Sequence, residues 1–202
     1  LRGVPPSNKT KFTLDKLSLS VTFQDGAEKI QLILEVHDGG RKSNSLHITE
    51  ISPRSVSGNP EWIEVSNPND FAISLEGWSF NHIAPSGETN ILLKEGVLKG
   101  HSTTIFTGDA ISQEIGNATH VIDLGQSGFL GVGAISGLDD GGGIVILSYT
   151  QLSEFRPFEI FRVEWGGDTG FFLTPTQTLE WNGNLPASSS DWFIPSQPSP
   201  GN

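Results

Sequence analysis

Two apolar runs, residues 12–23 and 28–37, flank an Asp-Gly step at Asp25 near the start of the chain. Every second residue from Ile30 to Val36 is apolar, so one face of the second run is wholly apolar. Glycine supplies the positive φ that tight hairpin turns need. The pattern predicts a β-hairpin. We expect its apolar face to dock on the rest of the chain, because a lone two-stranded ribbon is only marginally stable in water.

From residue 46 onward, short apolar and β-branched runs alternate with clusters of Gly, Pro, Asn and Ser. This pattern is typical of a β-sandwich or barrel. Residues 125–143 hold eight glycines in nineteen positions, which predicts a mobile surface loop. We therefore expect an all-β domain over residues 46–202, preceded by a hairpin segment over residues 1–45. The expected strands cover residues 46–51, 61–66, 72–80, 90–93, 103–107, 120–123, 143–149, 158–165 and 178–181.

Three blocks in the first third of this domain carry a family resemblance. They are Ile48-Thr-Glu-Ile51, Glu61-Trp-Ile-Glu-Val-Ser-Asn67 and Leu75-Glu-Gly-Trp-Ser-Phe80, and the chain closes on Ser199-Pro-Gly-Asn202. In this order and spacing they resemble the lamin tail domain family, whose members occur in nuclear lamins and in secreted and surface proteins of bacteria and archaea. The resemblance covers about residues 46–202 and implies an immunoglobulin-like β-sandwich on the microbial branch of the family. With the hairpin pattern of residues 12–37, the expected fold is an all-β, immunoglobulin-like β-sandwich with an extra N-terminal β-hairpin.

The resemblance has departures and leaves the N-terminus open. Thr49 stands where the family usually has Asn, and Gly100 lacks the proline that precedes this glycine in the family. Residues 35–45 resemble the last strands of bacterial immunoglobulin-like modules. The segment over residues 1–45 is therefore either an extension of the sandwich or the remnant of a preceding module.

The charge of the chain disfavours polyanionic partners. It carries 12 Lys and Arg against 23 Asp and Glu, a formal net charge of −11. The acidic excess lies in residues 46–202, and no Lys or Arg occurs between Lys99 and Arg156. Such a field repels phosphate backbones and anionic lipid headgroups. We expect neither a nucleic-acid partner nor direct membrane binding by this segment.

Two residue types are missing altogether. The absence of Cys excludes thiol catalysis, thiolate zinc sites and disulfides. The absence of Met leads us to expect a segment of a longer or processed product, whose signal peptide is not included. The strongest apolar run, near residues 143–149, is far shorter than the roughly 20 residues that cross a bilayer. With the resemblance, these features favour an extracellular or cell-surface location.

No motif of a familiar enzyme class is complete. Gly125-Gln-Ser-Gly128 lacks the glycine spacing of a nucleophile elbow, because Phe129 stands where glycine is needed. A dinucleotide-binding loop must be followed by a helix, and no helix is expected after the stretch from Gly131 to Gly137. The histidines show no metal-binding pair spacing. Two carboxylates far apart in the chain could still form a hydrolase site. We expect that the chain is not an enzyme.

Five side chains are candidates for ligand binding. Asp139 and Asp140 precede three glycines, a pattern that suits calcium and equally a solvated turn. Trp165, Trp181 and Trp192 lie in the later half of the chain. Exposed together they would form a docking face for a glycan or a protein, and buried they would fasten the C-terminal segment to the sandwich.

Four other side chains are interpreted as structural. Trp62 and Trp78 are expected in the core, since the strand over residues 61–66 has apolar side chains on both faces. Glu50 and Glu64 are expected to accept hydrogen bonds from backbone or hydroxyl donors, with a cation site as the alternative. The leading hypothesis is a non-catalytic interaction or scaffolding module of a larger secreted or cell-surface protein. The alternative is a glycan-binding accessory module, assisted by calcium or without any cofactor.

Overall fold

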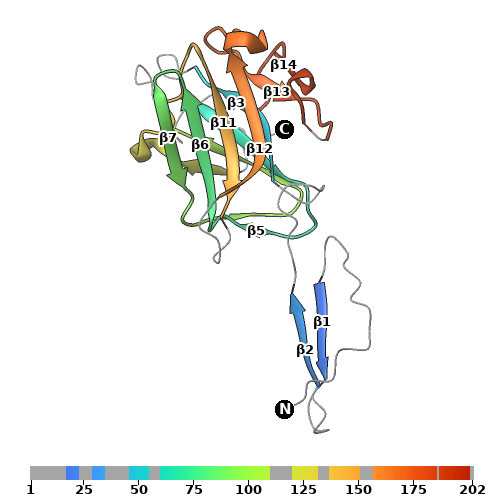
Figure 1. Cartoon of the computed structure of the whole chain (residues 1–202). Helices are drawn as coiled ribbons and strands as arrows, with labels where there is room; N and C mark the ends of the chain where they lie inside the picture. The colour runs from blue at the N-terminus through green and yellow to red at the C-terminus, as the bar shows by residue number, and fades with distance from the viewer. Residues whose placement is uncertain are drawn as a thin grey trace. The chain divides into compact units, whose positions relative to one another are not determined.

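The computed structural model describes residues 17–22, 29–34, 46–54, 60–109, 120–131, 137–150, 157–185 and 187–200. The chain divides into two compact units, Leu1–Gly39 and Gly40–Asn202 (Figure 1). In the first unit, β1 (Leu17–Thr22) pairs antiparallel with β2 (Lys29–Leu34). The expected hairpin pairing is confirmed. The Asp-Gly turn and residues 35–45 lie outside the described residues, and docking of the apolar face stays a prediction.

The second unit contains a six-stranded sheet of order β10-β9-β4-β3-β13-β14. Its neighbours pair antiparallel except β10 and β9, which are parallel. The parallel pair forms because a long connection, not a hairpin, joins the two strands. The strands are β3 (His47–Ser52), β4 (Trp62–Asn67), β9 (Ser102–Thr107), β10 (Val121–Asp123), β13 (Leu179–Trp181) and β14 (Trp192–Phe193).

A four-stranded antiparallel sheet of order β12-β11-β6-β7 faces the first sheet. Its strands are β6 (Trp78–Ala84), β7 (Gly87–Leu92), β11 (Gly142–Tyr149) and β12 (Phe158–Gly166). A short ribbon pairs β5 (Ile73–Ser74) with β8 (Val97–Leu98). The described helices are the 3₁₀ turns η2 (Gly125–Ser127), η3 (Gly167–Thr169) and η4 (Ser189–Asp191). No helix in the described ranges has the length and apolar character needed to cross a membrane.

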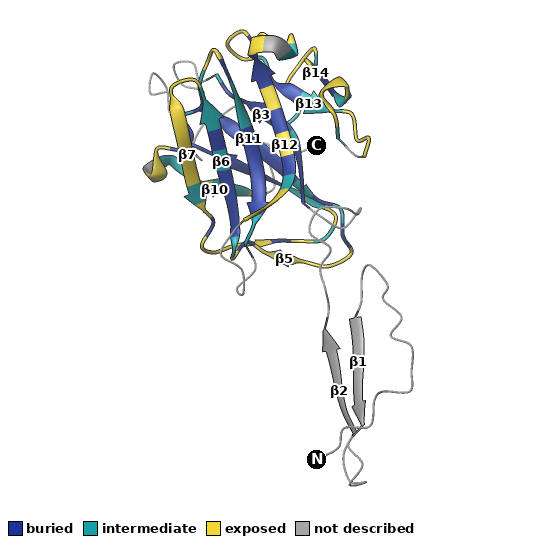
Figure 2. Cartoon of the chain, viewed as in Figure 1, coloured by how far each residue is buried: buried dark blue, intermediate teal, exposed yellow. Residues whose placement is uncertain are grey.

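The core lies between the two larger sheets, where their buried faces meet (Figure 2). Phe80 of β6 meets Phe106 of β9 edge to face, with 5.0 Å between ring centroids. Trp78 is buried in this core. Trp62 is also buried, in a smaller cluster with Ile105. The expected all-β sandwich is confirmed, and so is the expectation that β4 covers apolar surface on two sides.

The structure differs from the expected strands at two kinds of position. The run over residues 72–80 is divided into β5 and β6, because Gly77 adopts a φ of +84°. A Cβ there would lie 2.9 Å from the carbonyl oxygen of Thr150, so only glycine fits this turn. The strands β8 and β14 were not expected. Two residues are too few for alternation to be recognised.

Candidate functional site

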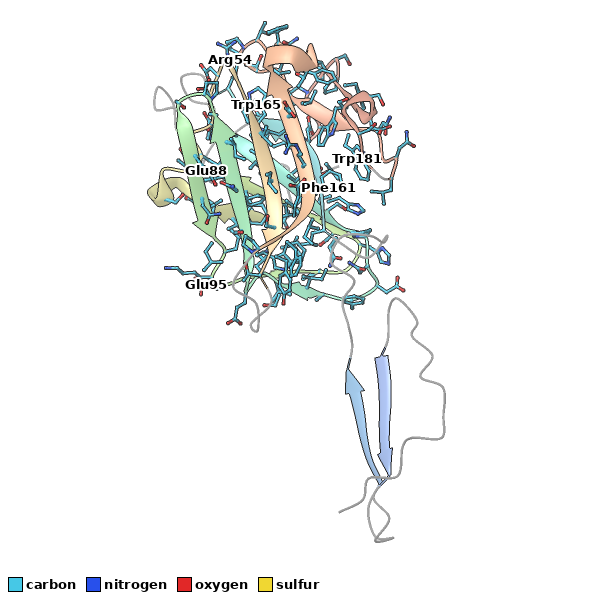
Figure 3. All side chains as sticks on the ribbon, viewed as in Figure 1. Arg54, Glu88, Glu95, Phe161, Trp165 and Trp181 are labelled. Carbon is cyan, nitrogen blue, oxygen red and sulfur yellow. The ribbon has the colours of Figure 1, made fainter. Side chains whose placement is uncertain are left out.

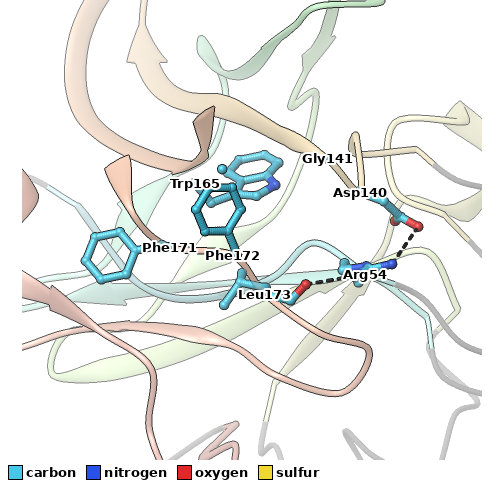
Figure 4. Close-up of a pocket in the computed structure, with 8 residues that line it drawn as sticks. Arg54, Asp140, Gly141, Trp165, Phe171, Phe172 and Leu173 are labelled. Carbon is cyan, nitrogen blue, oxygen red and sulfur yellow. Dashed lines mark hydrogen bonds and ion pairs between the residues drawn. The ribbon is translucent and has the colours of Figure 1, made fainter. Parts of the chain in front are cut away.

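A pocket of about 330 Å³ lies at the end of the sandwich where β12 finishes (Figure 4). Four separate segments form it: the loop after β3, the loop before β11, the end of β12 and the loop after η3. Figure 3 shows Arg54 and Trp165 near this end, away from Glu95 at the other. The lining residues are Arg54, Asp140, Gly141, Trp165, Gly166, Phe171, Phe172 and Leu173.

One wall of the pocket is polar. Arg54 donates from Nη1 to the carbonyl oxygen of Leu173 at 2.7 Å. Its Nη2 lies 3.6 Å from Oδ2 of Asp140, and the two side chains are 28% and 49% exposed. A pair this exposed contributes roughly 0–1 kcal/mol to stability. Its main effect is therefore to orient two opposite charges at the pocket, and Arg54 is a pocket residue that the sequence analysis missed.

The other wall is aromatic. Phe172 is 68% exposed, whereas Phe171 packs against the core and Leu173 is buried. Gly166 donates its N–H to the carbonyl oxygen of Phe171 at 2.9 Å, which folds the loop back onto β12. A Cβ at position 166 would lie 2.3 Å from the carbonyl oxygen of Gly141. The close approach of these two loops therefore requires glycine.

Trp165 is a core residue, and it also lines the pocket. It is 2% exposed, and its ring stacks on His82 with 5.7 Å between centroids. Its Nε1 donates to the carbonyl oxygen of Asp139 at 3.0 Å. The ring of His82 is largely buried, and this burial lowers the pKa of His82. Trp165 and His82 thus tie β12 and β6 to the loop before β11.

The two aspartates of that loop have separate partners. Oδ1 of Asp139 accepts the N–H of Gly141 at 2.8 Å, and its Oδ2 accepts the Ser86 hydroxyl at 3.3 Å. Asp140 faces Arg54. A calcium ion shared by both carboxylates would have to displace these donors, so the arrangement does not fit the calcium site considered from the sequence. Within the described ranges, no three His, Asp or Glu side chains gather as a metal site.

The remaining two tryptophans lie elsewhere on the sandwich. Trp192 is buried and Trp181 half-buried, on the paired strands β14 and β13. Both rings pack on Phe161 of β12, at 6.3 and 5.1 Å between centroids, and Trp181 also meets His47 at 5.1 Å. Trp165, Trp181 and Trp192 therefore do not form the exposed face required by the glycan-binding alternative. Because Trp181 and Trp192 bury large aromatic surfaces against Phe161, they fasten the ribbon of β13 and β14 to β12.

Glu50 and Glu64 act as structural acceptors. Glu50 accepts hydrogen bonds from the Thr178 hydroxyl at 2.5 Å and from the backbone N–H and hydroxyl of Ser199 at 3.3 and 3.1 Å. Its burial raises the pKa of Glu50, and these donors oppose the rise. Glu64 accepts the Thr49 hydroxyl at 2.5 Å. The expectation that both carboxylates meet backbone or hydroxyl donors is confirmed.

Glu61 is a further buried acceptor, and the sequence analysis did not single it out. It accepts the backbone N–H groups of Gly131 and Leu138 at 2.7 Å each and that of Gly137 at 3.3 Å. Desolvation raises the pKa of Glu61 to about 7, and the three N–H donors oppose the rise. No signal near residue 61 marks this role, because the donors lie 70 to 77 residues away.

The anchoring by Glu61 changes the interpretation of the glycine-rich segment. Phe129, Leu130 and Leu138 are buried in the main core. The described parts of residues 125–143 are therefore packed and hydrogen-bonded to the sandwich, so the expected mobile surface loop is wrong for them. Residues 132–136 lie outside the described residues. The error arose because glycine content reports backbone freedom, whereas burial of three large apolar side chains decides the packing.

Family models and curated proteins were compared with the chain. No protein-family model matches the chain, and no curated protein matches it. The fold and the pocket geometry therefore carry the functional argument, together with the three sequence blocks.

Proposed function

We propose that the chain is a non-catalytic interaction module with a lamin-tail-like, immunoglobulin-like sandwich. It would belong to a larger secreted or cell-surface protein. The observation that carries the proposal is the use of its buried carboxylates. Perturbed ionisable groups mark active sites when they face a cleft. Here Glu50, Glu61 and Glu64 are 1%, 0% and 4% exposed and hold distant segments of the chain together.

The pocket supplies the surface that an interaction module needs. Loops at the ends of β-sandwiches commonly carry binding residues, because the sheets hold them rigidly. Phe172, Asp140 and Arg54 lie on such loops and are accessible. The net charge of −11 favours partners other than nucleic acid or anionic membrane.

The family and the location rest on the sequence blocks. Residues 48–51 lie in β3, residues 62–67 form β4, and residues 75–80 turn into β6. The three blocks thus contribute strands to both large sheets. This placement is what a fold-determining signature requires, so it supports the lamin-tail-like sandwich. The secreted or surface location rests on the resemblance alone.

Turnover assays test the proposal. The purified chain is assayed on phosphate esters, nucleic acids and common glycans, with and without divalent ions, beside Glu50→Gln and Glu61→Gln. We expect no turnover from any of the three proteins, and altered unfolding free energies in both variants. Turnover by the parent chain that one of these single substitutions abolishes would overturn the proposal.

A further inference from the structure

Phe172 is presented on a loop that is fixed on both sides. It has the highest exposure, 68%, of the exposed large hydrophobic side chains in the described ranges. The residue before it, Phe171, receives the Gly166 N–H on its carbonyl and donates its own N–H to the Thr169 hydroxyl at 3.2 Å. The residue after it, Leu173, is buried and accepts from Arg54. Folding therefore holds an aromatic ring in water instead of burying it.

On the polar side of the same pocket, Arg54 and Asp140 can still form hydrogen bonds with a ligand. The 3.6 Å between Nη2 of Arg54 and Oδ2 of Asp140 is longer than a direct hydrogen bond. Both side chains are partly exposed, so a ligand can reach the guanidinium and the carboxylate at once. They are the only ionisable side chains that line the pocket in the described part of the chain, and their opposite charges cancel.

The chemistry of these walls selects the ligand. For an anion, the attraction of Arg54 is offset by the repulsion of Asp140, and for a cation the reverse holds, so neither gains a net electrostatic attraction. A wholly apolar molecule would remove water from both charged groups without replacing their hydrogen bonds. A neutral ring with an apolar C–H face and hydroxyl groups on its edge satisfies both walls. Its face covers Phe172, and its hydroxyls donate to Asp140 and accept from Arg54.

We propose that the pocket formed by Arg54, Asp140 and Phe172 binds a neutral pyranose sugar, as a free sugar or as the terminal residue of a glycan. The inference rests on the proposed interaction function and names its ligand class. The volume of about 330 Å³ lies at the lower end for ligand pockets, so it suits a single terminal residue better than an extended chain. The site differs from a tryptophan face, because Trp165 contributes only to the pocket lining.

The test is a titration followed by amide chemical shifts in two-dimensional NMR. The probes are the methyl pyranosides of glucose, galactose and mannose, and methyl N-acetylglucosaminide. Glucuronic acid and glucosamine serve as charged analogues, and a disaccharide of any binding sugar tests the glycan source. We expect saturable shifts in residues 166–173 with at least one neutral sugar and weaker binding of both charged analogues. A gain in affinity for the disaccharide identifies a glycan end as the ligand, and equal affinity identifies the free sugar.

Matched variants decide whether this pocket is responsible. Phe172→Ala should weaken binding about tenfold, the effect of roughly one aromatic contact. Phe158→Ala is the control, because Phe158 is also exposed but lies at the opposite end of β12. Thermal unfolding should be nearly unchanged in both. No saturable binding by any neutral sugar, or equal binding by Phe172→Ala and the parent chain, would refute the sugar site. That result leaves the non-catalytic proposal standing, since only turnover contradicts it.

Discussion

The buried carboxyl of Glu61 should set part of the pH dependence of stability. Its pKa is raised from 4.5 to about 7 in the folded protein. The folded state therefore binds this proton more tightly than the unfolded chain does. Its contribution to stability is complete below pH 4.5 and is lost as the pH rises through 7. At roughly 1.4 kcal/mol per pH unit, the loss amounts to about 3 kcal/mol.

The variant Glu61→Gln removes this titration while keeping the side-chain shape. Gly131 and Leu138 both donate to Oε2, so a glutamine oxygen at that position retains these two bonds. The bond from Gly137 to Oε1 is lost, at a cost on the order of 1 kcal/mol. We therefore expect the variant to be less stable than the parent chain near pH 4.5. Above pH 7 it should be at least as stable.

Urea unfolding at pH 4.5, 6 and 8 measures the effect, through the difference between parent and variant at each pH. His47, His82 and Glu50 also have shifted pKa values, but they are present in both proteins and cancel in the difference. The difference should change by about 3 kcal/mol across this range. Parallel pH profiles for the two proteins would show that Glu61 titrates normally, and the reasoning from its burial would be wrong.

Three further outcomes are expected. Trp62→Ala and Trp78→Ala should each cost about 3–5 kcal/mol in urea unfolding, as usual for an emptied aromatic core site; losses below about 1 kcal/mol would contradict their burial. Burial lowers the pKa of His47, so stability falls as the pH drops below 6.5, and His47→Phe should reduce that fall in thermal melts at pH 5 and 7. Calcium should leave the Tm unchanged, because Asp140 faces Arg54; a calcium-dependent rise abolished by Asp139→Asn or Asp140→Asn would contradict this.

The strands could be predicted because alternation is a local property. In β4, Ile63 and Val65 alternate with Glu64 and Ser66, and in β12 the apolar residues Phe161, Val163 and Trp165 alternate with Arg162 and Glu164. One apolar face of each strand is therefore evident from neighbours alone. The structural use of Glu50 and Glu64 followed from the same reasoning, since a carboxylate within an apolar strand needs donors. The break at Gly77 depends on the approach of Thr150, which is distant in sequence.

The pocket could not be predicted because its residues meet only through the tertiary fold. Arg54 bonds to Leu173, which lies 119 residues later, and nothing around Arg54 marks it as a site residue. Asp140 was singled out for its neighbouring glycines, and the structure places the Arg54 guanidinium beside it, a contact that no residue near Asp140 in the sequence indicates. Aromatic type alone also misled, because Trp165 is in the core whereas Phe172 is exposed.

The loop that carries Asp140 connects the stability of the sandwich with the pocket. The Glu61 carboxylate accepts the backbone N–H of Leu138. The next residue, Asp139, accepts hydrogen bonds from Trp165 and Gly141. Asp140 follows directly, and its carboxylate faces Arg54. Loss of the Glu61 anchor would loosen this loop at Leu138 without changing any pocket residue. A ligand that contacts Asp140 would then have to pay the cost of ordering the loop, which lowers affinity. Glu61→Ala should therefore weaken sugar binding more than Glu61→Gln, which keeps the bonds to Gly131 and Leu138.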